Sequence, residues 1–320
     1  MKALRFNTSG KLEHLNLADM PIPTPQSGEV VVRIKAAGLN TSDVSNVMGN
    51  HPYTTLPRTP GRDFAGVVCA GPAELLGREV WGTGKEFGFT RDGSHAEYVC
   101  APADGVAPKP RALSFAQAAA CGVPLTTAWT ALQRCSVGPG CRLLVLAATG
   151  GVGSMALSLG RWLGAEVTAA VRNPEQAANL ESRAVPVALL SGDTPLGISL
   201  QEFLGAGFDV VFDGSGALLA EAVPLLAPFG RIAVIVRYGD GKVNVPVRDL
   251  YRRAGSIVGI NSLLYGAAEC AGILSRLQPA FDAGQLMPPA GIEERPLARG
   301  VETYADLGRG ARCKFVFVAE

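Results

Sequence analysis

The sequence of 320 residues has no excess of charge of either sign, and this limits what the protein can bind. Its 29 lysines and arginines nearly balance its 28 acidic residues, which leaves a formal net charge of +1. A polycationic surface for nucleic acid or for an anionic membrane is therefore not expected. We expect a small, neutral or weakly charged ligand instead.

Paired cysteines are also absent. The seven cysteines are scattered singly, with no Cys-x-x-Cys pair. This spacing argues against both a disulfide framework and a four-cysteine zinc lobe. The three histidines, His14, His51 and His95, show no ligand spacing either. We therefore expect a cytoplasmic protein in a reducing compartment.

No long hydrophobic run is present. The N-terminal residues MKALRF lead directly into polar and charged residues, without the apolar core of a signal peptide. The most apolar stretch, Phe115 to Leu132, is interrupted by Gln117, by Pro124 and by several threonines. We therefore expect no membrane span.

Two textures follow one another along the chain. Up to about Pro110, short apolar runs such as EVVVRIKAAG are separated by glycine and proline clusters, which predicts a compact β domain. From about Leu113, strand-like runs alternate with helical ones, as in RLLVLAA, VGSMALSLGRWLG and AEVTAAV. This alternation predicts a parallel sheet covered on both faces. We also expect a helix over residues 217–230, and a last strand in CKFVFVAE that returns to the first domain.

The stretch AATGGVGSMAL has three glycines in four positions. They directly follow a buried strand-like run and open a helical segment. A turn without side chains lets the backbone approach a pyrophosphate, whose charge meets the free N–H groups at the start of the helix. A tight structural turn without a ligand is the alternative. We predict a dinucleotide site formed by Thr149, Gly150, Gly151, Val152 and Gly153.

The end of the second strand distinguishes between the two nicotinamide dinucleotides. An acidic residue there binds the ribose hydroxyls of NAD, whereas a basic residue accepts the 2′-phosphate of NADP. This chain has Arg172 and Asn173 after AEVTAAV, and no carboxylate. Charge complementarity therefore favours NADPH over NADH. The alternative is a solvated arginine beside a helix that starts at Pro174.

The sequence resembles the medium-chain dehydrogenase/reductase superfamily, and within it the zinc-independent quinone oxidoreductase-like branch. The resemblance is carried by GLNTSD, TPGRDFAGVV, CGVPLTTAWTAL, AATGGVG and FDGSG. It implies an α/β protein with a GroES-like β domain, residues 1–114 completed by 264–320, and a doubly wound Rossmann domain, residues 115–263. It also implies a nicotinamide held between these domains. A homodimer is implied too, in which an edge strand near Ile257 to Ile260 pairs across a two-fold axis.

The resemblance also bears on zinc. A catalytic zinc ion needs about three converging ligand side chains. Where the zinc enzymes of this superfamily carry those ligands, this sequence has Asn40, Arg62, Asp63 and Val123. Cys121 lies nearby without convergent partners and is better interpreted as a small buried thiol. We therefore expect no metal.

Without a metal, hydrogen-bond donors must stabilise a carbonyl oxygen that gains charge, and hydride needs an electron-poor acceptor carbon. These requirements point to an NADPH-dependent reductase of quinones or α,β-unsaturated carbonyls, with a small electrophilic substrate. By position in the family, the catalytic candidates are Asn40, Asp43, Tyr53 (or His51) and Arg62. Three of them have a stated structural alternative: a helix cap for Asp43, a half-buried loop ring for Tyr53, and a pair with Asp63 or another acid for Arg62.

Four further residues are candidates for cofactor contacts. Thr126 and Thr127 are expected to precede a helix, where they would donate to the cofactor or cap the helix. Ser215 lies in the DGSG turn, at the crevice where open sheets bind ligands, and Asn261 follows the last strand of the Rossmann domain.

Two other functions stay open at the level of sequence. One is a reductase or dehydrogenase of simple ketones and alcohols. The other is a nucleotide-binding protein without turnover. The loops at Gly49 to Pro57 and Lys85 to Asp92 are expected to shape the substrate pocket. The sequence does not identify the substrate, because its periodicity does not give the shape of these loops.

Overall fold

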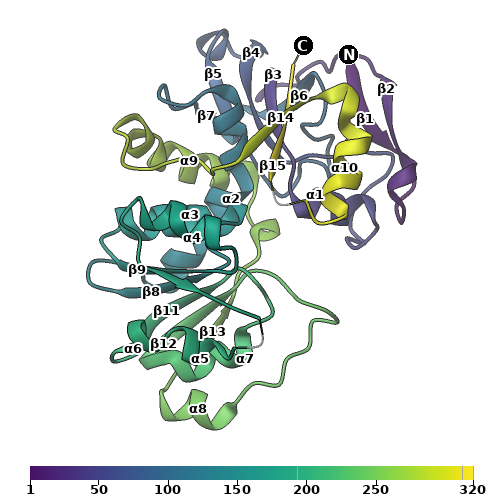
Figure 1. Cartoon of the computed structure of the whole chain (residues 1–320). Coiled ribbons are helices and arrows are strands. Elements are labelled where there is room, and N and C mark those ends of the chain that lie inside the picture. The colour runs from purple at the N-terminus through teal and green to yellow at the C-terminus, as the bar shows by residue number, and fades with distance from the viewer. Residues whose placement is uncertain (193, 312, 320) are drawn as a thin grey trace. The chain divides into compact units, whose positions relative to one another are not determined.

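The computed structural model describes residues 1–192, 194–311 and 313–319, and the chain divides into two compact units (Figure 1). Unit 1 comprises Met1–Thr126 and Ser262–Glu320, and unit 2 comprises Thr127–Asn261. The first division falls inside helix α2 (Phe115–Arg134), which runs from one unit into the other. The boundaries expected from the sequence were 114/115 and 263/264, because the hydrophobic pattern of the chain changes near those positions.

Unit 2 is built on a six-stranded sheet in the order β10-β9-β8-β11-β12-β13, with every pairing parallel. The strands are β8 (Arg142–Leu146), β9 (Glu166–Val171), β10 (Val187–Leu189), β11 (Phe208–Asp213), β12 (Leu226–Val234) and β13 (Ser256–Gly259). The order reverses between β8 and β11, as in a Rossmann fold, and this switch point is where such sheets bind ligands. The predicted doubly wound parallel sheet is confirmed.

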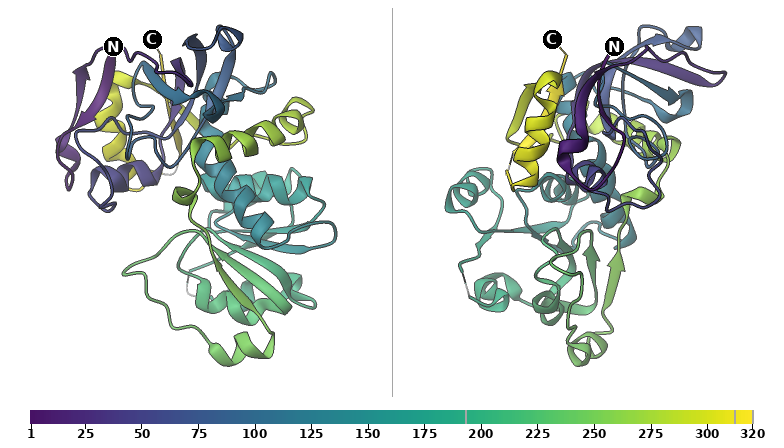
Figure 2. Two further views of the ribbon diagram at one scale, coloured as in Figure 1. Left: turned by 180° about the vertical axis from the view of Figure 1, so that it is seen from behind. Right: turned by 90° about the vertical axis from the view of Figure 1, so that its right-hand side faces the viewer.

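Helices cover both faces of this sheet (Figures 1 and 2). On one face lie α3 (Gly151–Trp162) and α4 (Pro174–Glu181), and on the other lie α5 (Leu196–Ser199), α7 (Leu219–Ala222) and α8 (Val247–Arg252). Short helices α6 (Gln201–Leu204) and η4 (Val223–Leu225) complete the connections. The central strands β8 and β11 are mostly apolar and buried, whereas the edge strand β13 is largely exposed.

The helix expected over residues 217–230 is wrong in its second half. The α-helical part ends at Ala222, one 3-10 turn containing Pro224 follows, and Leu226 already begins β12. Leu226 pairs with Phe208 of β11. Pro224 lacks the N–H that a helix interior needs, so the helix does not continue through it. The residues from Leu226 onward form a strand because they pair with β11.

Unit 1 contains a seven-stranded sheet in the order β14-β15-β3-β4-β5-β7, with β6 added on β3, and a separate β1-β2 pair. Its strands are β1 (Lys2–Phe6), β2 (Leu15–Asp19), β3 (Glu29–Gly38), β4 (Asp63–Ala70), β5 (Glu79–Gly82), β6 (Tyr98–Pro102), β7 (Ala107–Pro108), β14 (Ile292–Pro296) and β15 (Lys314–Val318). Strand β15 pairs antiparallel with β3, with Val316 opposite Gly38. The predicted return of the last strand to the first domain is confirmed.

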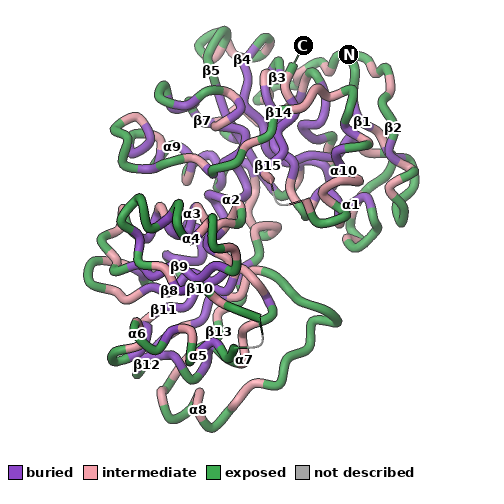
Figure 3. Tube along the Cα trace, viewed as in Figure 1, coloured by how far each residue is buried: buried purple, intermediate pink, exposed green. Residues whose placement is uncertain are grey.

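The helices of unit 1 surround this sheet. They are α1 (Thr41–Val47), the first part of α2, α9 (Ala267–Asp282) and α10 (Gly300–Gly308), with 3-10 turns η1 (Leu12–His14), η2 (Ala73–Leu75), η3 (Ala103–Gly105), η5 (Ser262–Leu264) and η6 (Leu297–Arg299). The core is a cluster of fully buried side chains that includes Phe64, Tyr304 and Phe315. Figure 3 shows the buried stretches of the chain in purple. Among the described helices, none is both long enough and apolar enough to cross a membrane.

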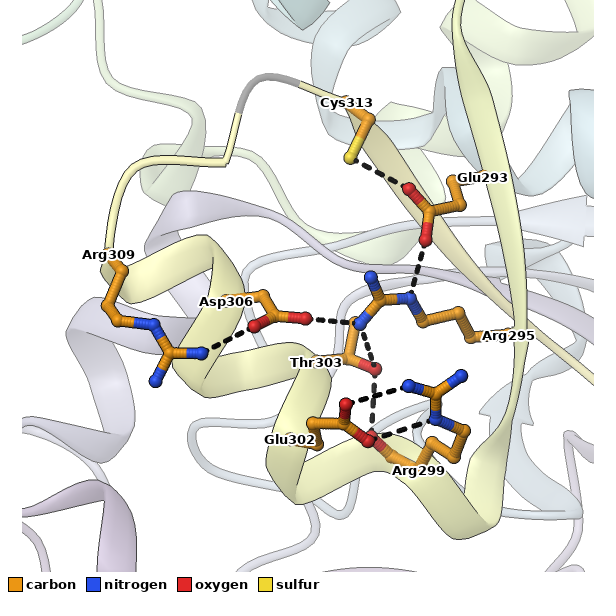
Figure 4. A network of polar contacts seen from close by, with 8 residues as sticks. All are labelled: Glu293, Arg295, Arg299, Glu302, Thr303, Asp306, Arg309 and Cys313. Atoms are coloured by element: carbon orange, nitrogen blue, oxygen red, sulfur yellow. Dashed lines mark hydrogen bonds and ion pairs between the residues drawn. The ribbon is translucent and has the colours of Figure 1, made fainter.

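A network of charged side chains joins α10 to β14 (Figure 4). The guanidinium of Arg295 lies 2.5 Å from Asp306 and 2.7 Å from Glu293, and it also covers the ring of Phe315 at 4.3 Å. Arg309 lies 2.6 Å from the other oxygen of Asp306. This network holds β14 beside β15, whose first residue is Lys314.

Candidate active site and cofactor site

In unit 1, the end of β3 leads through Asn40 into helix α1. Asn40 is the N-cap residue, and its backbone N–H donates to the carboxylate of Asp43 at 2.9 Å. The side chain of Asn40 takes part in a different set of contacts. Its Nδ2 donates to Asp63 Oδ2 at 2.9 Å, and its Oδ1 accepts from Lys314 Nζ at 2.7 Å.

Asp63 is the centre of this cluster and is fully buried at the start of β4. Its Oδ1 accepts the backbone N–H of Val123 at 2.8 Å, and its Oδ2 lies 3.8 Å from Lys314 Nζ. A Cβ on Gly122 would lie 2.2 Å from Asp63 Oδ1, so only glycine leaves room for the carboxylate. Several contacts thus satisfy a carboxylate that would otherwise be costly to bury.

Lys314 is the functional candidate that sequence reasoning missed. It is buried, it also donates to the Leu39 carbonyl at 3.1 Å, and burial lowers the pKa of its ammonium. The one available signal was a charged residue at the start of the otherwise apolar run KFVFV. A buried charge is rare unless it is paired. Its partners are distant in sequence, so the pattern alone did not reveal them.

Asp43 is buried beside the cluster, with 1% of its surface exposed. Burial and the neighbouring Asp63 carboxylate raise its pKa to about 7. Its bond to the Asn40 N–H is the capping role that the sequence left open as the structural alternative. A catalytic role for Asp43 stays a prediction.

Arg62 is fully buried and bound to uncharged acceptors. Its Nε donates to the Gly84 carbonyl at 3.0 Å, and its two terminal nitrogens donate to Ser262 Oγ at 3.0 Å and to the Ser262 carbonyl at 3.2 Å. It forms no ion pair with any carboxylate in the described part of the chain. The alternative of a pair with Asp63 is therefore not what the structure has. Arg62 instead links β4 to η5.

Tyr53 lies in the loop after α1, with 47% of its surface exposed. Its hydroxyl is 3.1 Å from His51 Nδ1, and its ring stacks on Phe89 with centroids 5.7 Å apart. Burial raises the pKa of Tyr53, and burial together with Arg62 lowers the pKa of His51. At neutral pH the pair is therefore a protonated phenol bonded to a neutral imidazole. When His51 Nδ1 carries the imidazole proton and donates it to the phenol oxygen, the phenol O–H is available to a ligand.

In unit 2, the glycine turn connects β8 to α3. Gly150 is the N-cap residue of α3, and a Cβ on Gly153 would lie 2.2 Å from the Ala147 carbonyl oxygen, so glycine is required there. The first N–H groups of a helix have no partner within it and are free to bind an anion. The Thr149 hydroxyl donates to Gln176 Oε1 at 2.9 Å. The first backbone N–H groups of α3 are therefore available to an anionic ligand.

Two buried polar atoms near this sheet also lack partners. Among the described residues, neither Thr127 Oγ1 nor Asp213 Oδ2 makes a hydrogen bond. Asp213 ends β11, beside the switch point, and its other oxygen accepts from the Ser215 hydroxyl at 2.7 Å. Unsatisfied buried polar atoms are costly unless a ligand or water completes them. Unit 2 therefore fits a polar nucleotide.

Arg172 follows β9 and lines a pocket of about 550 Å³. The other lining residues are Leu190, Gly192, Thr194, Pro195, Leu196, Leu218 and Glu221. Arg172 is exposed, and within the described ranges it makes no hydrogen bond or ion pair. Asn173, in contrast, caps α4: its Oδ1 accepts from the backbone of Glu175 at 2.8 Å and of Gln176 at 3.2 Å.

The placement of Thr126 and Thr127 before a helix is wrong. Both lie inside α2, which continues through Pro124. The Thr126 hydroxyl donates to the Gly122 carbonyl at 3.0 Å, one helical turn earlier. Their role in cofactor binding is a separate matter and stays a prediction. Asn261 follows β13, as expected.

The cluster around Asn40 does not fit a Zn²⁺ ion. An ammonium already contacts both the Asn40 oxygen and the Asp63 carboxylate. Cys121 donates its thiol proton to the Gln117 carbonyl at 3.2 Å, and burial raises the pKa of that thiol, so a ligating thiolate is disfavoured. In the described part of the chain, no three His, Cys, Asp or Glu side chains converge as metal ligands.

The fold and these sites define a two-unit oxidoreductase of the kind that uses a nicotinamide cofactor. Comparison with protein families gives the family directly. Residues 26–111 match the alcohol dehydrogenase GroES-like domain, and residues 151–278 match the zinc-binding dehydrogenase family. The chain belongs to the medium-chain dehydrogenase/reductase superfamily, with quinone oxidoreductase-like relatives.

Three relatives illustrate this membership. A zinc-type alcohol dehydrogenase-like protein of Schizosaccharomyces pombe is 35% identical over 290 residues, which cover 89% of this chain and 86% of the relative. The 2-methylene-furan-3-one reductase of Solanum lycopersicum is 30% identical over 301 residues, covering 90% and 71%. The human quinone oxidoreductase is 27% identical over 329 residues, covering 99% and 98%.

Solved structures agree with the fold. An NAD-dependent alcohol dehydrogenase superposes with a TM-score of 0.89 at 28% identity, covering the whole of both chains. A quinone oxidoreductase of Pseudomonas syringae pv. Tomato superposes with a TM-score of 0.83 at 26% identity, covering 99% of each chain. The predicted combination of a GroES-like domain and a Rossmann domain is confirmed.

Proposed function

We propose that this protein is an NADPH-dependent, zinc-independent reductase of quinones or α,β-unsaturated carbonyls. The observation that carries the proposal is the cluster of Asn40, Asp63 and Lys314, which offers hydrogen-bond donors where a metal site would need ligands. Relatives named quinone oxidoreductase and 2-methylene-furan-3-one reductase support this reaction class.

The site residues divide into two tasks. When bound, the reduced nicotinamide supplies a hydride to an electron-poor carbon of the substrate. Asn40 and Tyr53 are the proposed donors to the substrate oxygen, whose negative charge grows as the reaction proceeds. Tyr53 carries its proton at neutral pH, because burial raises its pKa. Water can supply the remaining proton.

The preference for NADPH rests on Arg172. This guanidinium lines the 550 Å³ pocket and is not neutralised by any described carboxylate. A 2′-phosphate there would gain charge-assisted hydrogen bonds from a planar donor group. The N-terminus of α3 would bind the pyrophosphate through its free N–H groups.

Assembly and localisation complete the proposal. We include a homodimer, formed by β13 strands that pair across a two-fold axis. Strand β13 is the last strand of its sheet and has one neighbour, β12, and Ile257 on it is 38% exposed. Strand edges with unpaired N–H and C=O groups are readily completed by a second copy. A cytoplasmic location remains part of the proposal.

The function is tested with a panel of quinones, enones, simple ketones and alcohols, assayed by the loss or gain of reduced nicotinamide absorbance. We expect quinones or enones to oxidise NADPH. Reduction of cyclohexanone without any activity on enones would select the reductase or dehydrogenase of simple ketones and alcohols. Saturable NADPH binding without turnover on any electrophile would select the binding protein.

A further inference from the structure

We infer that Lys314, together with Asp63, is a positioning residue that fixes the Asn40 amide with its nitrogen end as the donor available to the substrate oxygen. The inference rests on the proposed function and adds two residues to it. Its basis is one continuous set of buried contacts, from Lys314 to Asn40 to Asp63.

The chemistry of the two partners determines which way the amide points. An asparagine side chain can exchange its oxygen and nitrogen by a half turn, and both orientations have nearly the same shape. An ammonium can only donate a hydrogen bond, and an ionised carboxylate can only accept one. Lys314 therefore requires Oδ1, and Asp63 requires Nδ2. The half-turned amide would place N–H against ammonium and oxygen against carboxylate.

This arrangement leaves one N–H of Asn40 for a ligand. Nδ2 carries two hydrogens, and its one bond within the described residues is to Asp63. Asn40 is partly exposed, so the second hydrogen is not sealed in the core. The Lys314 ammonium on the amide oxygen also withdraws electron density from the amide and strengthens its N–H as a donor. Both effects favour stabilisation of a growing oxyanion.

The elements that carry these residues are themselves restrained. Lys314 opens β15, which pairs with β3 on one side and with β14 on the other. The network of Arg295, Asp306 and Glu293 joins β14 to α10 (Figure 4). Asp63 opens β4, which also pairs with β3. The ammonium and the carboxylate are thus held by strands on the two sides of β3, whose end leads directly to Asn40.

Removing the ammonium should release the amide. Without Lys314, the Asn40 Oδ1 loses the ammonium that only an oxygen can face, so the Asp63 contact alone restrains the amide. The free-energy difference between the two orientations of the amide would then be smaller, and the half-turned amide would be populated.

The test compares Lys314→Met with a matched control, Lys109→Met. Lys109 is another buried lysine of unit 1, and it donates to the Pro110 and Leu113 carbonyls at 2.9 and 2.6 Å. We expect Lys314→Met to lower kcat about 10- to 100-fold on the best substrate while the NADPH Kd changes less than about twofold. Lys109→Met should lower Tm by a similar amount and change kcat less than about twofold.

A double-mutant cycle with Asn40→Ala separates positioning from general destabilisation. In the Asn40→Ala background, Lys314→Met should reduce kcat by less than about threefold, because the amide that it positions is gone. Independent, additive losses would overturn the inference, as would an equal loss of kcat in Lys109→Met. Should Lys314→Met not fold, Asp63→Asn takes its place in the cycle with the same expected non-additivity.

A second measurement does not depend on turnover. The side-chain ¹⁵N–¹H₂ signals of Asn40, assigned by their loss in Asn40→Ala, should form one sharp pair in the wild type, and the proton bonded to Asp63 should be protected from exchange. They should broaden and lose protection in Lys314→Met but not in Lys109→Met. Unchanged signals in Lys314→Met would refute the positioning role of Lys314. If no quinone or enone is reduced, the proposed function fails, and this measurement still decides the positioning role.

Discussion

The Lys314 ammonium lies 2.7 Å from the amide oxygen of Asn40, although the two residues are 274 positions apart in sequence. The contact places a buried cation beside Asp63, whose Oδ2 lies 3.8 Å from Lys314 Nζ. The charge of this region is therefore carried by side chains, and its polar groups act as hydrogen-bond donors and acceptors.

Arg172→Ala should remove most of the preference for NADPH. A charge-assisted hydrogen bond contributes about 1.5–3 kcal/mol, so the wild type should bind NADPH at least about tenfold more tightly than NADH. Calorimetric titration of both cofactors checks this, with Arg161→Ala as a control in the same unit, since Arg161 bonds to the Arg183 carbonyl. Equal affinities in the wild type would remove the basis for NADPH.

Dialysis against a strong chelator should leave turnover unchanged. The described side chains around Asn40 include an ammonium rather than a set of metal ligands, so no ion is needed to order them. Metal analysis and turnover are measured before and after dialysis. One zinc ion per chain, lost together with activity, would contradict this prediction.

Tyr53→Phe should lower turnover more than it weakens NADPH binding. Loss of a donor to a developing oxyanion costs about 2.7–4 kcal/mol in a dry site and less where water replaces it. The substitution keeps the aromatic ring, so the stack on Phe89 stays in place. It removes the hydroxyl and with it the contact to His51 Nδ1. Full turnover in both Tyr53→Phe and Asn40→Ala would show that the donors lie elsewhere.

Asp43 should make the free energy of unfolding depend on pH. Its folded pKa of about 7 exceeds the unfolded value near 4, so its contribution is fully present below about pH 4 and is lost as pH rises through 7. Urea unfolding should therefore show Asp43→Asn gaining stability relative to the wild type over that interval. A difference that stays constant with pH would contradict the prediction.

Comparing the wild type with Asp43→Asn also removes the pH dependence of stability that other titrating groups contribute. Burial lowers the pKa of His95 to about 3, so its contribution is present above the unfolded pKa near 6.5 and is lost as pH falls toward 3. His95 is the same in both proteins, and its effect cancels in the difference.

Ile257→Lys should convert the proposed dimer into a monomer. A charge in the middle of β13 opposes pairing of two exposed edges across a two-fold axis. Light scattering at micromolar concentration measures the mass of the wild type and of the variant. A monomeric wild type would count against the dimer, and an unchanged dimer in Ile257→Lys would exclude β13 as its interface.

Much of the fold was predictable because its signals are local. The alternation of strand-like and helical runs predicted the parallel sheet, since the central strands are continuous apolar runs and the helices have a period of their own. The turn at Gly150 to Gly153 was recognisable because the glycines, the preceding strand and the following helix are consecutive in the sequence. Residues 217–230 were misassigned because pairing of Leu226 with β11 overrides the local pattern.

The sequence by itself therefore determined the two-unit α/β architecture, the glycine turn before α3 and the residue at the end of β9. Only the tertiary structure decided how the polar residues of unit 1 combine. Arg62 bonds to Ser262 rather than to Asp63, and Asn40 meets Lys314 from the last strand. The physical reason is that a buried charge must find partners wherever folding brings them. Such partners come from strands adjacent in the sheet, and their distance along the chain leaves no local pattern.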